Sequence, residues 1–288
     1  MIVVIVGPTG VGKTKLSVEL AKKLNAEIIN CDSMQVYKDL NIGTAKVRED
    51  EKDNIPHHLL DIVNPNDLYT VYDYQKDCRS KIKELQDKNK NIIIVGGTGL
   101  YVKAALYDYK FDKEEEKKDY RNYTNEELLE KIKEKDPTLD IHLNNRKRLE
   151  RALEKLENNG EFTKEGNNKL YEFYTIGLTT SRENLYNIIN NRVDKMMDEG
   201  LLEEVEVLYK NNIRSKAINT GIGYKELYKY FDNEISKEEA IELIKKNSRH
   251  YAKRQYTFFN HQMDVKWFET NYKDFSKTIE EVYNYIKD

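Results

Sequence analysis

The chain of 288 residues carries 48 lysines and arginines against 51 acidic residues, which gives a formal net charge of −3. This length suits one large domain, or a core with a smaller inserted domain. The hydrophobic fraction of 39% and the charged fraction of 34% predict a helix-rich globular protein with much solvated surface. A charge so near neutral neither indicates nor excludes a nucleic-acid partner, because clustering of positive charge decides that question.

Several classes of protein are not favoured by the sequence. No apolar run approaches the roughly 20 residues that cross a membrane. The apolar start, IVVIV at 2–6, has no basic region before it and ends at Gly7-Pro8, so we expect no secretory signal. Cys31 and Cys78 form neither a metal-binding pattern nor a disulfide framework. We therefore expect a cytoplasmic enzyme that is a monomer and has no membrane partner.

The first part of the chain predicts strands alternating with helices. The run at 2–6 is typical of a strand buried on both faces, and Lys13–Leu24 has helical spacing. Such alternation implies a parallel sheet with right-handed crossovers. The further elements expected here are strands at Ala26–Asn30, His58–Val63 and Asn91–Val95, and a helix at Tyr72–Leu85.

After Tyr109 the composition changes. The charge run DKEEEKKD at 112–119 predicts a solvated helix or a linker. The later elements expected are helices at 125–135, 144–157, 182–199, 201–211, 223–231 and 236–256, strands at 173–178 and 265–268, and a short C-terminal helix. We interpret the chain as an α/β core (1–110 and 172–288) with helices on both faces of a parallel sheet, interrupted by a small helical insertion (111–171).

The segment GPTGVGKT at 7–14 has the spacing of a phosphate-binding P-loop. Glycines let backbone N–H groups converge on phosphate oxygens, Lys13 supplies a positive charge, and the Thr14 hydroxyl can bind Mg²⁺. The loop lies between a buried strand and a helix N-terminus, whose dipole favours anions. The residues expected to hold the phosphates are Gly7, Thr9, Gly10, Val11, Gly12, Lys13 and Thr14.

The next two strand ends carry further candidates. Asp32 follows the second strand, where it could cap a helix, hold Mg²⁺ or accept a proton from a substrate. The fourth strand is followed by GGTGLY, with no acid to position Mg²⁺ as in many P-loop nucleotidases. Gly96-Gly97 permits a close approach, and Thr98 offers a hydroxyl there. This pattern weakens the case for an ordinary ATPase but leaves small-molecule kinases open.

Two basic clusters lie downstream. In NNRKRLERALE, Arg148 and Arg151 are three residues apart and can share a helix face. Residues 245–254 carry five lysines and arginines and no acid, with aromatic residues interleaved. Such a segment suits nucleic-acid binding, but it equally suits a solvated helix face with a buried aromatic stripe.

Taken together, these motifs resemble the tRNA dimethylallyltransferase (tRNA isopentenylpyrophosphate transferase) family. The resemblance covers most of the chain, in order. The segments that carry it are GPTGVGKT at 7–14, DSMQVYKDLNIGTAK at 32–46, PHHLLDIVNP at 56–65, VGGTGLY at 95–101, HLNNRKRLERALE at 142–154, RVDKMMDEGLLEEV at 192–205, GIGYKEL at 221–227 and RHYAKRQYTFF at 249–259.

The resemblance implies transfer of a dimethylallyl group from its diphosphate to N6 of adenosine 37, in tRNAs that read codons beginning with U. The P-loop would then hold the diphosphate of the donor, with Lys13 and Mg²⁺ on Thr14 stabilising the leaving pyrophosphate. Asp32 would be the general base, and Thr98 would lie beside it in the same channel. The target base would be extruded from the anticodon loop.

The resemblance also implies an RNA-binding surface that grips the anticodon stem-loop. The residues it assigns to tRNA are Asp32, Ser33, Met34, Gln35, Thr98, Arg121, Lys147, Arg148, Arg151, Arg254 and Gln255. Some family members carry an arginine where this chain has Asn219-Thr220, so a pyrophosphate role at that point does not carry over.

Three alternative functions remain open from the sequence. An adenylate (AMP) isopentenyltransferase shares the P-loop, the Asp and the GGT motif, although a mononucleotide needs no basic insertion. A P-loop small-molecule kinase or NTPase shares the phosphate cradle. A non-enzymatic RNA-binding module is the third, but it has no need of Lys13 and Asp32 together.

Overall fold

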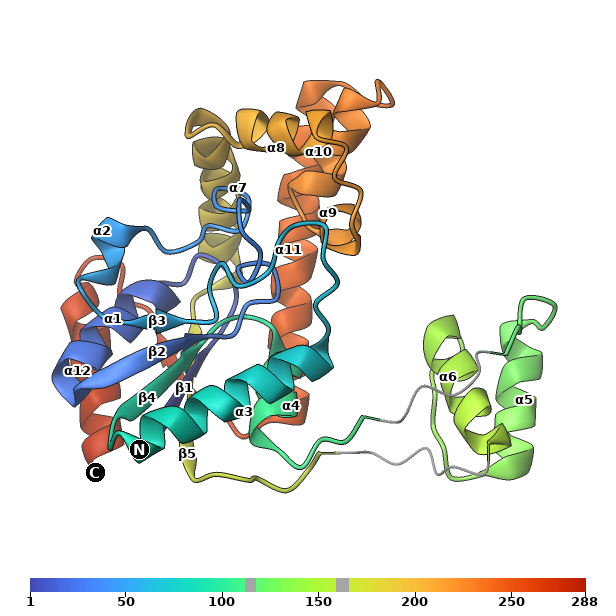
Figure 1. The fold of residues 1–288 in the computed structure, drawn as a ribbon, viewed down its shortest axis with the longest axis horizontal. Coiled ribbons are helices and arrows are strands. Elements are labelled where there is room, and N and C mark those ends of the chain that lie inside the picture. The colour runs from blue at the N-terminus through green and yellow to red at the C-terminus, as the bar shows by residue number, and fades with distance from the viewer. Residues whose placement is uncertain (112–117, 159–165) are drawn as a thin grey trace. The chain divides into compact units, whose positions relative to one another are not determined.

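The computed structural model describes residues 1–111, 118–158 and 166–288, which form two compact units (Figure 1). The larger unit, here called the core, comprises Met1–Tyr107 and Lys169–Asp288; the smaller, the insertion, is Asp108–Asn168. From the sequence, the insertion is expected at 111–171. Most of the charge run expected at 112–119 lies outside the described residues.

The core is built on one sheet in the order β3-β2-β4-β1-β5-β6, with every pairing parallel. This arrangement confirms the predicted parallel α/β sheet. The strands are β1 (Ile2–Val6), β2 (Ala26–Asn30), β3 (His57–His58), β4 (Asn91–Val95), β5 (Phe173–Thr179) and β6 (Lys266–Glu269).

Helices cover both faces of the sheet, as Figure 1 shows. Alternate residues of β1 point to opposite faces: Ile2, Val4 and Val6 join one apolar cluster, and Val3 and Ile5 join the other. The first cluster contains residues of α3 (Val71–Asp87) and α4 (Gly99–Leu106) and of the end of α11 (Lys237–Gln262). The second contains residues of α1 (Lys13–Leu24), α7 (Arg182–Asp198) and α12 (Phe275–Lys287).

The remaining core helices are short. They are α2 (Glu49–Lys52), α8 (Leu201–Lys210), α9 (Lys216–Thr220) and α10 (Tyr224–Phe231). A third apolar cluster joins α8, α9 and α10 to α11 and also includes Val36, Tyr37 and Leu40. The loop after β2 is therefore packed against helices that come much later in the chain.

The third predicted strand, His58–Val63, is wrong in its extent. The strand β3 ends at His58, and the next residues turn away because Leu59 and Asp61 adopt left-handed backbone conformations, with φ of 59° and 54°. The amides of Ile62 and Val63 bind the carbonyl of Val36 rather than β2. The segment after β3 thus supports the loop after β2.

The insertion is a pair of helices, α5 (Asn125–Lys135) and α6 (Arg146–Glu157), with a small apolar cluster of its own. Arg146, the first residue of α6, bonds to the carbonyls of Tyr120 (2.7 Å) and Tyr123 (2.8 Å) and to the Glu150 carboxylate (2.7 Å). It therefore ties the segment before α5 to α6, whereas the next residue, Lys147, is exposed.

Two further expectations concern membranes and cysteines. Among the described residues, no helix is long and apolar enough to cross a membrane. Cys31 and Cys78 are both buried and free, which agrees with the expectation of no disulfide.

We predict that Arg146→Met loosens the insertion, because two backbone carbonyls and a carboxylate lose their donor, at a cost of about 1–3 kcal/mol. Hydrogen–deuterium exchange of α5 and α6 should become faster, while exchange in the β1–β4 region stays the same. Lys147→Met is the matched control and should leave the exchange unchanged. Equal exchange in the two variants would contradict a structural role for Arg146.

Candidate active site

Three loops meet at the carboxyl edge of the sheet. They are the P-loop after β1, the segment after β2 that begins with Cys31-Asp32, and the Gly96-Gly97-Thr98 turn after β4. Because β4 lies between β2 and β1, its turn separates the loops that carry Asp32 and Lys13. Ligands of open α/β sheets bind at this edge.

The P-loop turns directly into a helix N-terminus. Gly12 has a left-handed φ of 94° and begins α1, whose first residue is Lys13. The Lys13 ammonium donates to the loop's own Pro8 carbonyl at 2.7 Å. Thr14, in the first turn, is exposed. The Val11 side chain is in the core and its carbonyl accepts from the Thr270 hydroxyl at 3.0 Å, so Val11 can offer a ligand only its backbone N–H.

A second cation, Arg192 of α7, shares this site. Burial and the charge of Arg192 lower the pKa of Lys13 to about 7, and the charge of Asp32 raises it in part. The same burial lowers the pKa of Arg192, which Asp32 opposes. These couplings mean that two cations and one carboxylate lie within electrostatic reach of one another. Arg192 was not among the expected site residues; its place within a resembling motif, RVDKMMDEGLLEEV, was the only signal in the sequence.

The turn after β4 leaves room for the loops on either side. A Cβ atom on Gly96 would lie 2.1 Å from the carbonyl oxygen of Cys31. The backbone N–H of Thr98 donates to that same carbonyl, and the Thr98 hydroxyl accepts from the Ser33 N–H at 3.0 Å. Thr98 and the beginning of the Asp32 segment are therefore fixed to each other.

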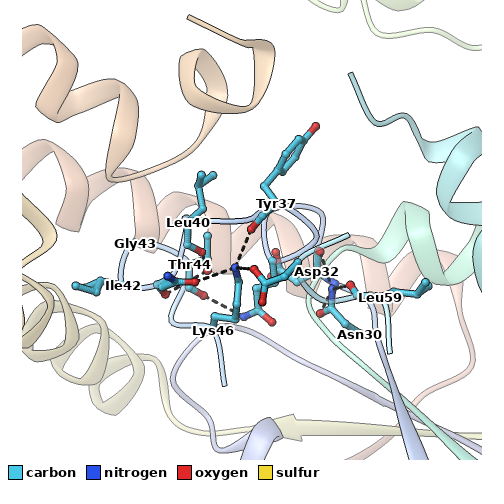
Figure 2. A network of polar contacts seen from close by, with 12 residues as sticks. Asn30, Asp32, Tyr37, Leu40, Ile42, Gly43, Thr44, Lys46 and Leu59 are labelled. Carbon is cyan, nitrogen blue, oxygen red and sulfur yellow. Dashed lines mark hydrogen bonds and ion pairs between the residues drawn. The ribbon is translucent and has the colours of Figure 1, made fainter. Parts of the chain in front are cut away.

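Only one carboxylate oxygen of Asp32 takes part in capping a turn. Its Oδ1 accepts from the Met34 N–H at 2.9 Å, while Oδ2 accepts no hydrogen bond from the described residues. Asn30 fixes the backbone of Asp32 by accepting from its N–H and donating to its carbonyl, each at 3.1 Å. Asn30 also donates to the Leu59 carbonyl at 3.0 Å (Figure 2).

Residues 32–46 are here called the acceptor segment. The ammonium of Lys46, at the end of the segment, is buried and bonds back to earlier residues of it (Figure 2). Only 5% of the Lys46 side chain is exposed. Its ammonium donates to the Tyr37 carbonyl (2.7 Å), the Asn41 side chain (3.0 Å) and the Asp61 carboxylate (2.5 Å). Three acceptors match its three protons, so the buried charge is fully satisfied.

Gln35 and Met34 are held by the same segment and by the helices behind it. The Gln35 amide donates to the carbonyls of Thr44 (3.0 Å) and Ala45 (3.3 Å). The Met34 methyl group lies 2.6 Å from the position that a Cβ atom on Gly221 would take. Both expected RNA-contacting side chains therefore depend on the conformation of the acceptor segment.

Helix α11 closes the other side of the site. Gln255 is 5% exposed; its amide donates to the Gly97 carbonyl at 3.0 Å, while its Oε1 has no partner among the described residues. Burial, followed by the charge of Asp32, raises the pKa of Tyr251 to about 12, and the neighbouring Thr98 opposes that rise. Arg254 is exposed, with its guanidinium 5.6 Å from the Tyr251 ring.

Only part of the basic segment 245–254 faces solvent. Lys245 pairs with Asp194 of α7 at 2.8 Å, and Arg249 donates to Asn190 at 2.5 Å. The neighbouring Phe259 is fully buried, and Phe258 packs against Gly99. These residues attach α11 to the core, which leaves Lys246, Lys253 and Arg254 as its exposed cations.

The insertion presents the other expected cations. Lys147, Arg148 and Arg151 are all exposed on α6. Arg121 is exposed too, but its guanidinium forms a two-pronged pair with Asp119 at 2.8 and 3.0 Å. On α5, Lys133 lines a hollow together with Glu126, Glu130 and Glu134. The exposed cations of α6 therefore form a basic surface on the insertion, whereas Lys133 on α5 lies among glutamates.

The described residues fit Mg²⁺ only as a partner of a phosphate. None of the histidine, cysteine, aspartate or glutamate side chains within them form a group of three that could hold a metal. Mg²⁺ often takes one or two protein ligands and completes its shell with phosphate oxygens and water. The exposed Thr14 hydroxyl beside the phosphate cradle suits that arrangement.

Comparisons with known proteins identify the family of the chain. The chain is 49% identical to a tRNA dimethylallyltransferase of Anoxybacillus flavithermus over 99% of this chain and 96% of that one. The structure of a full-length tRNA isopentenylpyrophosphate transferase of Bacillus halodurans matches with a TM-score of 0.79 at 43% identity, over 99% of this chain and 95% of that one. A eukaryotic dimethylallyltransferase described as acting on tRNA matches with a TM-score of 0.75 at 28% identity, over 92% and 73%. The family model described as IPP transferase matches residues 35–262. The chain belongs to the IPP transferase family.

Proposed function

We propose that this enzyme transfers a dimethylallyl group from dimethylallyl diphosphate to N6 of adenosine 37 in tRNAs that read codons beginning with U. The observation that carries the proposal is the grouping of Lys13, Arg192 and Asp32 around a turn that has no acid of its own. Two cations suit a leaving diphosphate, and a carboxylate with a free oxygen suits an attacking amine. Because all three loops come from one chain, we expect a monomer, acting in the cytoplasm where its tRNA substrate is.

The phosphate side of the site would hold the leaving group. The Lys13 ammonium would exchange the Pro8 carbonyl for a phosphate oxygen, and Arg192 would neutralise further charge. The backbone N–H groups of the P-loop would bind the remaining oxygens. Mg²⁺, held by Thr14 and the diphosphate, would stabilise the negative charge that grows as the C–O bond breaks.

The acceptor side would supply the nucleophile. As the allylic carbon loses the diphosphate, the adenine N6 forms the new C–N bond and loses one proton. Asp32 Oδ2 would accept that proton, since Oδ1 is already occupied by the Met34 amide. Thr98 would orient the amine from its fixed place beside Ser33, with Gln255 holding the turn.

The exposed cations suit an anticodon stem-loop better than a mononucleotide. Lys147, Arg148 and Arg151 on the insertion and Arg254 on α11 would contact phosphates, while Ser33, Met34 and Gln35 meet the RNA around the target base. We assign Gln255 an indirect role, because its buried amide supports Gly97. The direct test is mass spectrometry of tRNA nucleosides after incubation with enzyme and labelled donor. Modification of AMP as fast as of a stem-loop would favour the adenylate isopentenyltransferase alternative.

We predict that Asp32→Asn abolishes prenyl transfer, with a loss of at least about 10²-fold, because the amide keeps the bond to Met34 but cannot accept a proton. Filter binding should show tRNA affinity within a few-fold of wild type. Loss of tRNA binding instead would mean that Asp32 has mainly a structural role.

We predict that pyrophosphate binding takes up a proton at pH 8. Free Lys13, with a pKa of about 7, is mostly neutral there, and a bound anion raises that pKa, so affinity should weaken as the pH rises from 7 to 9. Calorimetry in two buffers of different ionisation enthalpy measures the uptake. Lys13→Arg, which stays charged, is the control and should take up correspondingly less. Equal uptake by both proteins would exclude Lys13 as the source.

We predict that Arg148→Met and Arg151→Met each weaken stem-loop binding and reduce the salt dependence of log Kd by roughly one counterion. Lys133→Met is the matched control: it removes an exposed cation from the same unit, but from acidic surroundings that repel phosphate. An unchanged salt slope in the arginine variants would remove them from the phosphate contacts.

A further inference from the structure

The carboxylate of Glu204, on α8, is directed at the acceptor segment. Its Oε2 accepts from the backbone N–H groups of Asn41 (2.9 Å) and Ile42 (2.8 Å). Its Oε1 accepts from the Gly43 N–H (3.1 Å) and from the Tyr224 hydroxyl (2.7 Å). Four donors therefore converge on one side chain.

Such an arrangement is chemically specific. Successive backbone N–H groups that point inward form a site for an anion, and here the protein's own carboxylate fills it. Hydrogen bonds to an ionised acceptor are shorter and stronger than neutral ones. Tyr224 adds a steric contact, since a Cβ on Gly43 would lie 2.7 Å from its ring. The turn at 41–43 is thus held by charge and by shape at once.

The turn is linked in two ways to the residues proposed to meet the RNA. The Thr44 hydroxyl donates to the Leu40 carbonyl at 2.7 Å, and the Thr44 carbonyl in turn accepts from Gln35 (Figure 2). Met34 touches Gly221, and the ring of Tyr224 lies 3.2 Å from the Cβ position of the same glycine. A movement of the turn would therefore displace both Gln35 and Met34.

We propose that Glu204 is a positioning residue for the acceptor RNA. Together with Tyr224 it fixes the turn at 41–43, and through that turn it sets the conformation of the acceptor segment. The proposal rests on the proposed function only in taking tRNA as the acceptor. Glu204 touches neither the RNA nor the donor in this role; it acts through Met34 and Gln35.

The helices that carry Glu204 and Tyr224 are also held together by contacts that do not involve this carboxylate. The α8 and α10 helices are already joined by buried apolar residues, among them Leu201, Val205, Leu208 and Leu227. A variant that loses the charge of Glu204 should therefore stay folded, and the substitution should mainly lower kcat/KM for the RNA. The donor site is held by other contacts, of the P-loop with Thr270 and of the Gly97 turn with Gln255.

The test is steady-state kinetics of Glu204→Gln with an anticodon stem-loop RNA and dimethylallyl diphosphate. Glutamine keeps the size of the side chain, but its NH₂ group faces backbone donors, so the turn must shift. Because a displacement of about 1 Å can cost up to 10²-fold, we expect kcat/KM for the RNA to fall at least about ten-fold. The KM for the donor should stay within about two-fold. Glu203→Gln, the exposed neighbour on the same helix, should behave as wild type.

A second variant makes the result independent of one substitution. Tyr224→Phe removes one of the four donors, so it should show a smaller loss with the same RNA-selective pattern. In the double variant, the loss in log kcat/KM for RNA should be smaller than the sum of the losses in the two single variants, because both residues act on one turn. An unchanged kcat/KM for RNA would overturn the proposal. So would a KM for the donor that rises as much as the kcat/KM for RNA falls. Failure of the wild-type enzyme to modify any RNA would instead reject the proposed function.

Discussion

The site depends on the space above β4. Lys13 and Asp32 follow strands that are not neighbours, because β4 lies between β1 and β2. Their loops can approach one ligand only if the turn after β4 does not block the space between them. Gly96 and Gly97 have no side chains that would block it. A Cβ on Gly96 would lie 2.1 Å from the Cys31 carbonyl oxygen, and one on Gly97 would lie 2.1 Å from the Gln255 amide nitrogen. A side chain in place of Gly96 or Gly97 would therefore collide with one of these groups, and neither residue supplies the acid found at this strand end in many P-loop nucleotidases.

Charges are arranged on the two sides of that space according to the chemistry proposed for each. Burial and the charge of Arg192 lower the pKa of Lys13, and burial lowers the pKa of Arg192; a bound diphosphate would favour the charged form of both. Asp32 partly compensates for both cations in the free protein. In the proposed reaction, the diphosphate would take over that compensation and would leave Asp32 free to act on the attacking amine. The roles proposed for Lys13 and Asp32 are therefore supported by electrostatics as well as by position.

The acceptor segment shows how a long loop can be made rigid without a strand or helix. Its backbone groups need partners, and buried or half-buried ionic groups supply them. Lys46 satisfies acceptors from inside the segment, and Glu204 satisfies donors from outside it. Charged hydrogen bonds are directional, so they specify one conformation where apolar contacts alone would allow several.

The sequence by itself determined the local features of this protein. The strands β1, β2 and β4, the long helices and the P-loop were predictable because apolar periodicity and glycine spacing are properties of neighbouring residues. The family was also identifiable from ordered motifs. The tertiary structure alone decided which distant residues meet. It brought Arg192 close to Lys13, joined Lys245 and Arg249 to α7, ended β3 at His58 and directed Glu204 to the turn at 41–43. Such contacts follow from strand order and helix packing, which no short stretch of sequence encodes.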